Sequence, residues 1–212
     1  MYRKFIRFRP ISRDLEIIFI DTFQVMIESL GFLAGSILIA HITEEKTDCV
    51  GKKLTCRTPL KDVLHHSFCN ISEYEKYIDL IPIIPGAIVL WISQYKNNNL
   101  DICQVVRTGS LVLLLRALTT RVTILPSPIC DKTHPKALGG CNSCIFSGHA
   151  AFMLIFSYYI YKCFPQMLKW LLIYAILGSV LIITTRSHYT IDVLVSWLAV
   201  YTILNMQSHY SL

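Results

Sequence analysis

Long apolar stretches alternate with shorter polar ones along this chain. Six stretches are apolar over about the 20 residues that a helix needs to cross a bilayer core of about 30 Å. They lie at 15–42, 77–95, 103–125, 146–164, 167–185 and 189–206. The pattern therefore predicts an all-α fold, a polytopic membrane protein with six transmembrane helices in one bundle.

Composition supports this prediction. Hydrophobic residues make up 53% of the chain and charged residues only 16%, more apolar surface than a soluble domain of this size needs. The formal net charge of +6 is concentrated near the N-terminus, in Arg3, Lys4, Arg7, Arg9 and Arg13. Beside a membrane span, such a cluster marks a cytosolic flank. No nucleic-acid-binding module follows it, so no nucleic-acid partner is expected.

The basic N-terminus also sets the expected domain organisation. Residues 1–14 are expected in the cytosol, 15–206 form one six-helix transmembrane domain, and 207–212 form a cytosolic tail. The loops at about 43–76 and 126–145 then lie on the luminal or extracellular side.

Cysteines support the same orientation. Six of the eight fall in the loops predicted to be luminal: Cys49, Cys56, Cys69, Cys130, Cys141 and Cys144. Disulfides form in such oxidising compartments, so at least one is expected among these six. The spacing Cys141-x-x-Cys144 also fits zinc, but no second matching pair accompanies it, and disulfides are favoured. The sequon Asn70-Ile71-Ser72 falls on this side as well.

Two histidines are the main candidates for chemistry. His149 and His188 begin the fourth and sixth predicted spans, 39 residues apart, which is close to one crossing down and one back. Both should therefore lie at the same depth. Asp192 shares a helical face with His188 and can fix its tautomer. A lone interfacial histidine is more often a structural anchor, but three ionisable groups at one depth indicate catalysis.

Phosphate-binding groups are predicted around these histidines. Ser147 and Gly148 open a helix, where backbone N–H groups and the helix dipole favour an anion. Arginine binds phosphate through its bidentate guanidinium group. The candidates are Arg116, Arg121 and Arg186. For Arg116, a structural ion pair with Glu28 or Asp21 is an equal alternative.

These motifs together resemble the sphingomyelin synthase family of the lipid phosphate phosphatase superfamily. The resemblance covers about 59–204 and includes the residues after the third span and, more weakly, 59–62. It is carried chiefly by Cys141-x4-Phe146-Ser147-Gly148-His149 and by His188-Tyr189-Thr190-Ile191-Asp192-Val193.

The resemblance implies a six-span ceramide phosphotransferase in sphingolipid metabolism. Such an enzyme moves a phospho-head-group from a glycerophospholipid donor to ceramide and releases diacylglycerol. His188 would be the nucleophile that forms a phosphohistidine, Asp192 would orient it, and His149 would be the general acid and base. No metal or cofactor is implied. The site would face the lumen of the Golgi or endoplasmic reticulum, or the cell exterior at the plasma membrane, and homo-oligomerisation is compatible with this arrangement.

Departures from the family pattern leave the head group open. Asn142 and Ser143 replace the Gly-Asp of the family, which removes a carboxylate that could face choline or ethanolamine. Arg186 instead resembles the inositol-phosphorylceramide type of plants and protists. The alternatives are a lipid phosphatase that uses water as acceptor and a non-catalytic ceramide-sensing protein. The phosphatase pattern expects arginine where this chain has Ile182, and the intact histidines argue against the non-catalytic class.

Overall fold

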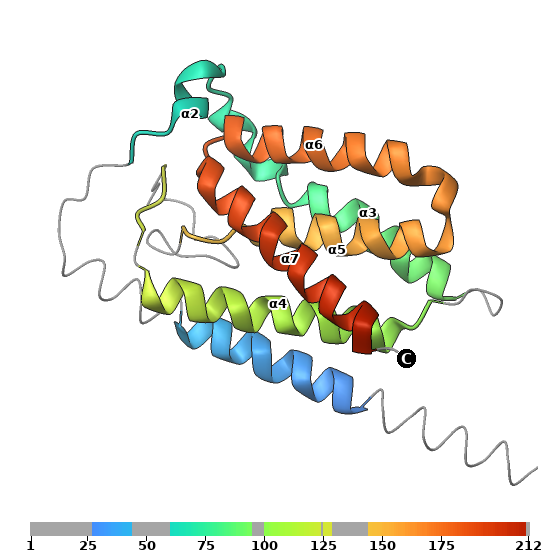
Figure 1. Ribbon diagram of the computed structural model, residues 1–212. Coiled ribbons are helices and arrows are strands. Elements are labelled where there is room, and N and C mark those ends of the chain that lie inside the picture. The colour runs from blue at the N-terminus through green and yellow to red at the C-terminus, as the bar shows by residue number, and fades with distance from the viewer. Residues whose placement is uncertain (1–26, 44–59, 95–99, 124, 129–143, 211–212) are drawn as a thin grey trace, which may run out of the picture.

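The computed structural model describes residues 27–43, 60–94, 100–123, 125–128 and 144–210. This part of the chain is mostly helical (Figure 1). Their bounds are Ile27–Thr43, α2 Val63–Ser67, η1 Ser72–Tyr77, α3 Leu80–Ser93, α4 Ile102–Val122, α5 Gly148–Cys163, η2 Pro165–Met167, α6 Leu168–Thr184 and α7 Thr190–Tyr210. The all-α fold is confirmed for these residues.

Helix α5 forms the core of the bundle. It packs against α3, α4, α6 and α7, which surround it in Figure 1. Ala150, Ala151, Met153 and Ile155 on this helix are completely buried. Helix α6 approaches it closely because Gly178 has no side chain, and a Cβ there would lie 2.5 Å from the Met153 sulfur. The helix that carries His149 is thus fixed by packing on several sides.

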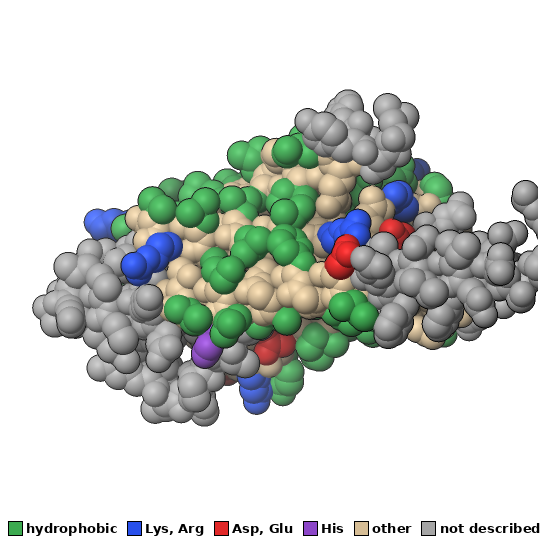
Figure 2. All heavy atoms as spheres, turned by 90° about the horizontal axis from the view of Figure 1, so that it is seen from below, with side chains coloured by type: hydrophobic (Ala, Val, Ile, Leu, Met, Phe, Trp, Pro, Cys, Tyr) green, Lys and Arg blue, Asp and Glu red, His purple; other side chains and the backbone are tan. Residues whose placement is uncertain are grey.

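Four described helical segments are long and apolar enough to cross a membrane. They are Ser72–Ser93, Ile102–Val122, Pro165–Thr184 and Thr190–Gln207. Large apolar side chains on them face outward, including Trp91, Leu118 and Leu198, each at least 60% exposed. Hydrophobic side chains are also scattered over the face shown in Figure 2. Burial in lipid explains this exposure, and the chain is an integral membrane protein.

One of the six predicted spans is shorter than expected, and another is described only in part. Helix α5 has 16 residues, which extend about 24 Å, less than the hydrocarbon core. Ser147 caps its start, and Pro165 follows its end, so the helix cannot extend further without losing these stops. Of the first predicted span, the structure describes the helix Ile27–Thr43, and residues 15–26 lie outside the described ranges. The bundle of six full-length spans is therefore not confirmed by the described residues.

The segments predicted to share one side of the membrane do meet at one end of the bundle. The Ile71 amide donates to the Thr184 carbonyl oxygen over 3.2 Å, and the Cys144 amide donates to the Leu125 carbonyl oxygen over 3.2 Å. The starts of α5 and α7 lie at this same end. His149 and His188 therefore lie at the same end of the bundle, as predicted.

Several predictions concern residues outside the described ranges. Cys69 has an exposed free thiol, and Cys144 is buried. The basic N-terminal cluster falls outside the described part of the chain. So do the remaining loop cysteines, which are Cys49, Cys56, Cys130 and Cys141. The disulfide remains a prediction for these four.

Candidate active site

His188 and Asp192 form a buried pair at the start of α7. The His188 Nδ1 atom lies 3.2 Å from Asp192 Oδ2, and the Tyr189 amide donates to that same oxygen over 3.0 Å. His188 is 8% exposed and Asp192 is 0% exposed. Because a carboxylate accepts hydrogen bonds, this contact places the imidazole proton on Nδ1 and leaves Nε2 with its lone pair.

His149 has an aspartate partner of its own, which comes from another helix. Its Nε2 atom lies 2.8 Å from Oδ1 of Asp79, the residue that precedes α3. Among the described residues, its Nδ1 atom is buried and has no hydrogen-bond partner. His149 is therefore held at Nε2, and its Nδ1 atom is left for proton transfer.

The two imidazole rings face each other across the end of the bundle. Their centroids are 6.0 Å apart, and their planes meet at 62°. Each ring is oriented by one carboxylate, Asp192 for His188 and Asp79 for His149. Two histidine–aspartate pairs thus converge on one small volume, an arrangement suited to a nucleophile and a separate general acid and base.

The start of α5 is hydrogen-bonded to α7 rather than left open. The Ser147 hydroxyl accepts from the Ala150 amide over 3.3 Å, as an N-cap does. The Ser147 amide donates to the Ser196 hydroxyl over 2.8 Å, and that hydroxyl contacts the Ser147 and Asp192 carbonyl oxygens. Ser147 thereby fixes the position of His149 relative to His188, and its hydroxyl already has a role in capping.

Arg116 and Arg121 occupy different environments on α4. Arg116 is 6% exposed, and its guanidinium atoms lie 3.9 Å from where a Cβ of Gly148 would be. A buried positive charge thus lies beside the start of α5. Arg121 is exposed in the last turn of α4. The structure brings Arg116 to the histidines, and for Arg121 a phosphate contact remains a prediction.

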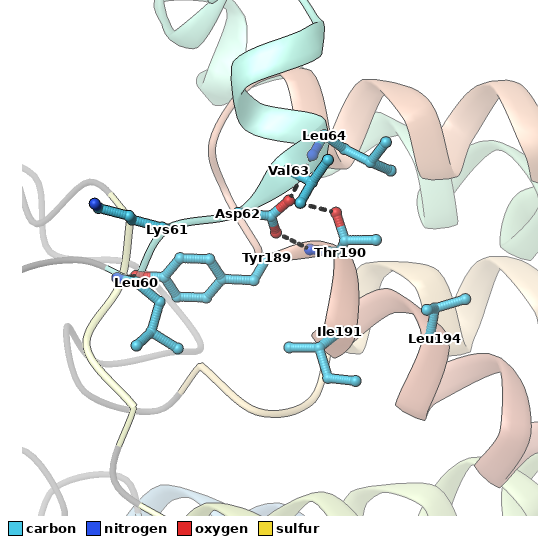
Figure 3. Close-up of a pocket in the computed structure, with 9 residues that line it drawn as sticks. All are labelled: Leu60, Lys61, Asp62, Val63, Leu64, Tyr189, Thr190, Ile191 and Leu194. Atoms are coloured by element: carbon cyan, nitrogen blue, oxygen red, sulfur yellow. Dashed lines mark hydrogen bonds between the residues drawn. The ribbon is translucent and has the colours of Figure 1, made fainter.

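A segment before η1 covers the start of α7, and we call residues 60–71 the clasp. Asp62 is its centre. Asp62 Oδ2 accepts from the Thr190 amide over 2.7 Å, and Asp62 Oδ1 accepts from the Thr190 hydroxyl over 2.8 Å and the Leu64 amide over 2.9 Å (Figure 3). One carboxylate therefore caps both α2 and α7. Burial alone would raise the Asp62 pKa, but these hydrogen bonds outweigh it and lower the pKa below its ordinary value.

The clasp also contacts the backbone of the nucleophile candidate. His65 donates from Nε2 to the His188 carbonyl oxygen over 3.2 Å, and its ring stacks on Tyr189. The Arg186 guanidinium group donates to the carbonyl oxygens of His65 and Phe68. Arg186 has a positive φ of 60°, which turns the chain sharply before His188. The predicted phosphate role of Arg186 stays a prediction, because its Nη2 atom is engaged in the clasp.

A cavity of about 300 Å³ lies between the clasp and the start of α7. Figure 3 shows the Tyr189 ring directed toward Leu60 and the Lys61 side chain directed away from α7. Apolar side chains form most of the lining: Leu60, Val63, Leu64, Ile191 and Leu194. The cavity is therefore suited to hydrocarbon and lies one residue along the chain from His188.

Comparisons with known proteins cover part of this site. Residues 140–211, which contain both histidines and Asp192, match the family model described as PAP2 superfamily C-terminal. This segment is similar to the PAP2 superfamily C-terminal domain. The predicted resemblance to the lipid phosphate phosphatase superfamily is thereby confirmed over the matched residues.

The curated relatives that match this segment have names that describe transfer to ceramide. A phosphatidylinositol:ceramide inositolphosphotransferase of Oryza sativa subsp. indica is 45% identical over 67 residues, 30% of this chain and 20% of the relative. Phosphatidylinositol:ceramide inositolphosphotransferase 3 of Arabidopsis thaliana is 42% identical over 65 residues, 29% of this chain and 22% of the relative. The chain spans about one fifth of the length of these relatives. Together with the family match, they support the predicted resemblance.

Sequence reasoning missed two residues that contribute to the candidate active site. Asp79 had a usable signal, since it is a carboxylate at the same predicted membrane boundary as the histidines. Ser196 had no such signal, because the sequence around a serine in an apolar helix does not indicate which residue its hydroxyl contacts. Asp62 was noted within a weak motif, but its bonds to Thr190 were not predicted.

We expect the clasp to make the folded protein sensitive to acid through His65. Burial lowers the His65 pKa from its ordinary value of 6.5, and the positive charge of Arg186 lowers it further. The hydrogen bond to the His188 carbonyl oxygen and the charge of Asp62 act in the opposite direction, but the net change is a lower pKa. The unfolded chain then binds more protons just below pH 6.5, so stability is full above that pH and falls as pH decreases. We expect lower thermal stability at about pH 5.5 than at about pH 7.5.

Substitution separates His65 from other titrating groups. His65→Gln keeps an N–H donor but cannot titrate, so its unfolding temperature should vary less with pH than that of the unaltered protein. His66→Gln is the matched control, because His66 is the exposed neighbour on α2. Equal pH dependence in His65→Gln and the unaltered protein would contradict the assignment.

Proposed function

We propose that this protein is a ceramide phosphotransferase that moves inositol phosphate from phosphatidylinositol to the primary hydroxyl of ceramide and releases diacylglycerol. The observation that carries the proposal is the convergence of two histidine–aspartate pairs within a PAP2 segment. The names of the relatives support phosphatidylinositol as the donor. Arg186 supports the same choice through its likeness to the inositol type.

The proposed reaction has two steps at one phosphorus. His188 Nε2 attacks phosphorus, the bond to the diacylglycerol oxygen breaks, and His149 gives that oxygen a proton. The ceramide hydroxyl then gives its proton to His149 and attacks phosphorus, and the bond to His188 breaks. Asp192 and Asp79 hold the two rings, and Arg116 supplies positive charge for the phosphate oxygens. Every proton is accounted for without a metal.

The lipid chains need an apolar path to this site. The cavity beside Tyr189 is lined by apolar side chains of the clasp and α7, and it lies at the end of a candidate membrane span. We assign it to a hydrocarbon chain of one substrate. The proposed domain comprises 15–206, with the site on the luminal or extracellular side of a Golgi, endoplasmic reticulum or plasma membrane.

A donor-by-donor assay tests the proposal. Purified protein in vesicles receives fluorescent ceramide and one phospholipid donor at a time. We expect inositol-phosphorylceramide from phosphatidylinositol, and much less product from phosphatidylcholine or phosphatidylethanolamine. His188→Ala protein at equal concentration is the control for non-enzymatic transfer.

The other outcomes identify the rival functions. Sphingomyelin as the main product would contradict the donor choice and retain the transferase. Release of inositol phosphate into water without a ceramide product would indicate a phosphatase. Absence of any turnover with all donors would favour a non-catalytic protein. Ser143→Asp, which restores the family carboxylate, should shift activity toward the cationic head groups if charge governs donor choice.

A further inference from the structure

A sulfur atom lies beside the proposed nucleophile. Ligand atoms of Cys144, His188 and Asp192 all lie within 4.8 Å of one another. Cys144 is 4% exposed, and its backbone is fixed by the hydrogen bond from its amide to the Leu125 carbonyl oxygen. The three side chains come from the loop before α5 and from the start of α7, so the fold itself brings them together.

A second observation points to a cation ligand at Asp192. Asp192 Oδ2 accepts hydrogen bonds from His188 and Tyr189, but Asp192 Oδ1 is buried and has no hydrogen-bond partner in the described part of the chain. A buried carboxylate oxygen without a partner is costly. A metal ion between Oδ1 and the neighbouring sulfur and imidazole would remove that cost.

The donor set selects the class of metal. Sulfur and imidazole ligands favour zinc and similar borderline or soft cations, whereas Mg²⁺ and Ca²⁺ prefer oxygen ligands throughout. Three protein ligands leave a fourth tetrahedral position open for water. We propose that Cys144, His188 and Asp192 form a zinc-binding site that overlaps the nucleophile and inhibits transfer when it is occupied.

Inhibition follows from the geometry of His188. If zinc binds Nε2, it occupies the lone pair that attacks phosphorus. If zinc binds Nδ1, it displaces the hydrogen bond to Asp192 and withdraws electron density from the ring. Either mode prevents the same histidine from acting as a nucleophile. This consequence rests on the proposed function, whereas zinc binding itself does not.

Metal binding is tested first, without reference to activity. The purified full-length protein is equilibrated with ZnCl₂ and freed of unbound metal, and its zinc content is measured. We expect about one tightly bound zinc per chain, and its loss in Cys144→Ala. Cys103→Ala is the matched control, because Cys103 is also buried but lies at the start of α4, and it should retain the metal.

Cobalt identifies the ligand directly. Co²⁺ bound in place of zinc should give a sulfur-to-cobalt charge-transfer absorption in the unaltered protein and in Cys103→Ala, and none in Cys144→Ala. Equal zinc content and equal cobalt spectra in Cys144→Ala and the unaltered protein would overturn the site. A disulfide at Cys144 in the purified protein would overturn it as well.

Inhibition is tested second. Zinc should inhibit transfer by the unaltered protein, a chelator should restore it, and Mg²⁺ should have no inhibitory effect. Cys144→Ala should require at least about ten-fold more zinc for the same inhibition, as expected when one of three ligands is lost. Bound zinc without inhibition would overturn the regulatory part of the proposal. Absence of transfer by the metal-free protein would count against the proposed function, while the zinc content would still decide the site.

Discussion

Replacement of His188 by alanine is expected to reduce head-group transfer to the non-enzymatic background. The proposed mechanism places a covalent bond between this imidazole and phosphorus, and alanine offers no nucleophile in its place. Burial and the hydrogen bond to Asp192 hold the ring in one orientation. Product formation from labelled phosphatidylinositol and ceramide measures the effect.

The covalent intermediate gives a second and more direct measurement. Protein exposed to labelled donor without ceramide should acquire label that is lost in acid and retained in alkali, as expected of a phosphorus–nitrogen bond. His188→Ala should acquire none, and subsequent addition of ceramide should remove the label from the unaltered protein. His66→Ala is the control for a general loss of histidine, because His66 is exposed on α2. Transfer at the original rate by well-folded His188→Ala would eliminate the phosphohistidine.

Asp192 should behave as a positioning residue in the same assay. Asp192→Asn retains both histidines but replaces a charged acceptor with an amide, so control of the His188 tautomer is weakened. Activity should fall steeply, and label should form slowly rather than not at all. A mutation that only destabilised the bundle would lower the amount of folded protein without changing the ratio of labelling rate to transfer rate.

The sequence was sufficient to predict the site residues that depend on local order. His188 and Asp192 are four residues apart on one helix, so their proximity is a property of the helix itself. The relation of His149 to His188 follows from one crossing and one return through the membrane, and both rings do meet. The ends of α5 were predictable to within two residues, because proline is a strong stop.

Features that depend on packing between distant segments were not predictable in this way. The clasp is short, and its partners lie more than 110 residues away in the sequence. Nothing in its hydrophobic pattern marks Asp62 as the cap of α7. The apolar character of α5 was taken to mean contact with lipid. Much of that apolar surface instead packs against four other helices.

Loss of His149 should slow transfer without removing the covalent step. General acid–base catalysis typically contributes about 10²–10⁴-fold, so His149→Ala should lower the transfer rate by that factor. The cause is specific, because diacylglycerol leaves as an alkoxide that needs a proton. A donor whose leaving group is a nitrophenolate needs none. With that donor, His149→Ala should form the labelled His188 intermediate at close to the original rate, yet pass the label to ceramide slowly, because the ceramide hydroxyl still lacks a base.

Asp79 is the hydrogen-bond partner of His149, so its replacement gives a second test of the role of His149. Asp79→Ala removes the partner of His149 Nε2 and should reduce transfer less than His149→Ala does, since the imidazole remains. The double variant should be no slower than His149→Ala alone, because residues that act as a unit are not additive. Glu75→Ala, one turn earlier and also acidic, is the matched control. A double variant whose defects multiply would show that Asp79 acts independently of His149. An unchanged preference of His149→Ala between the two donors would show that this histidine does not protonate the leaving group.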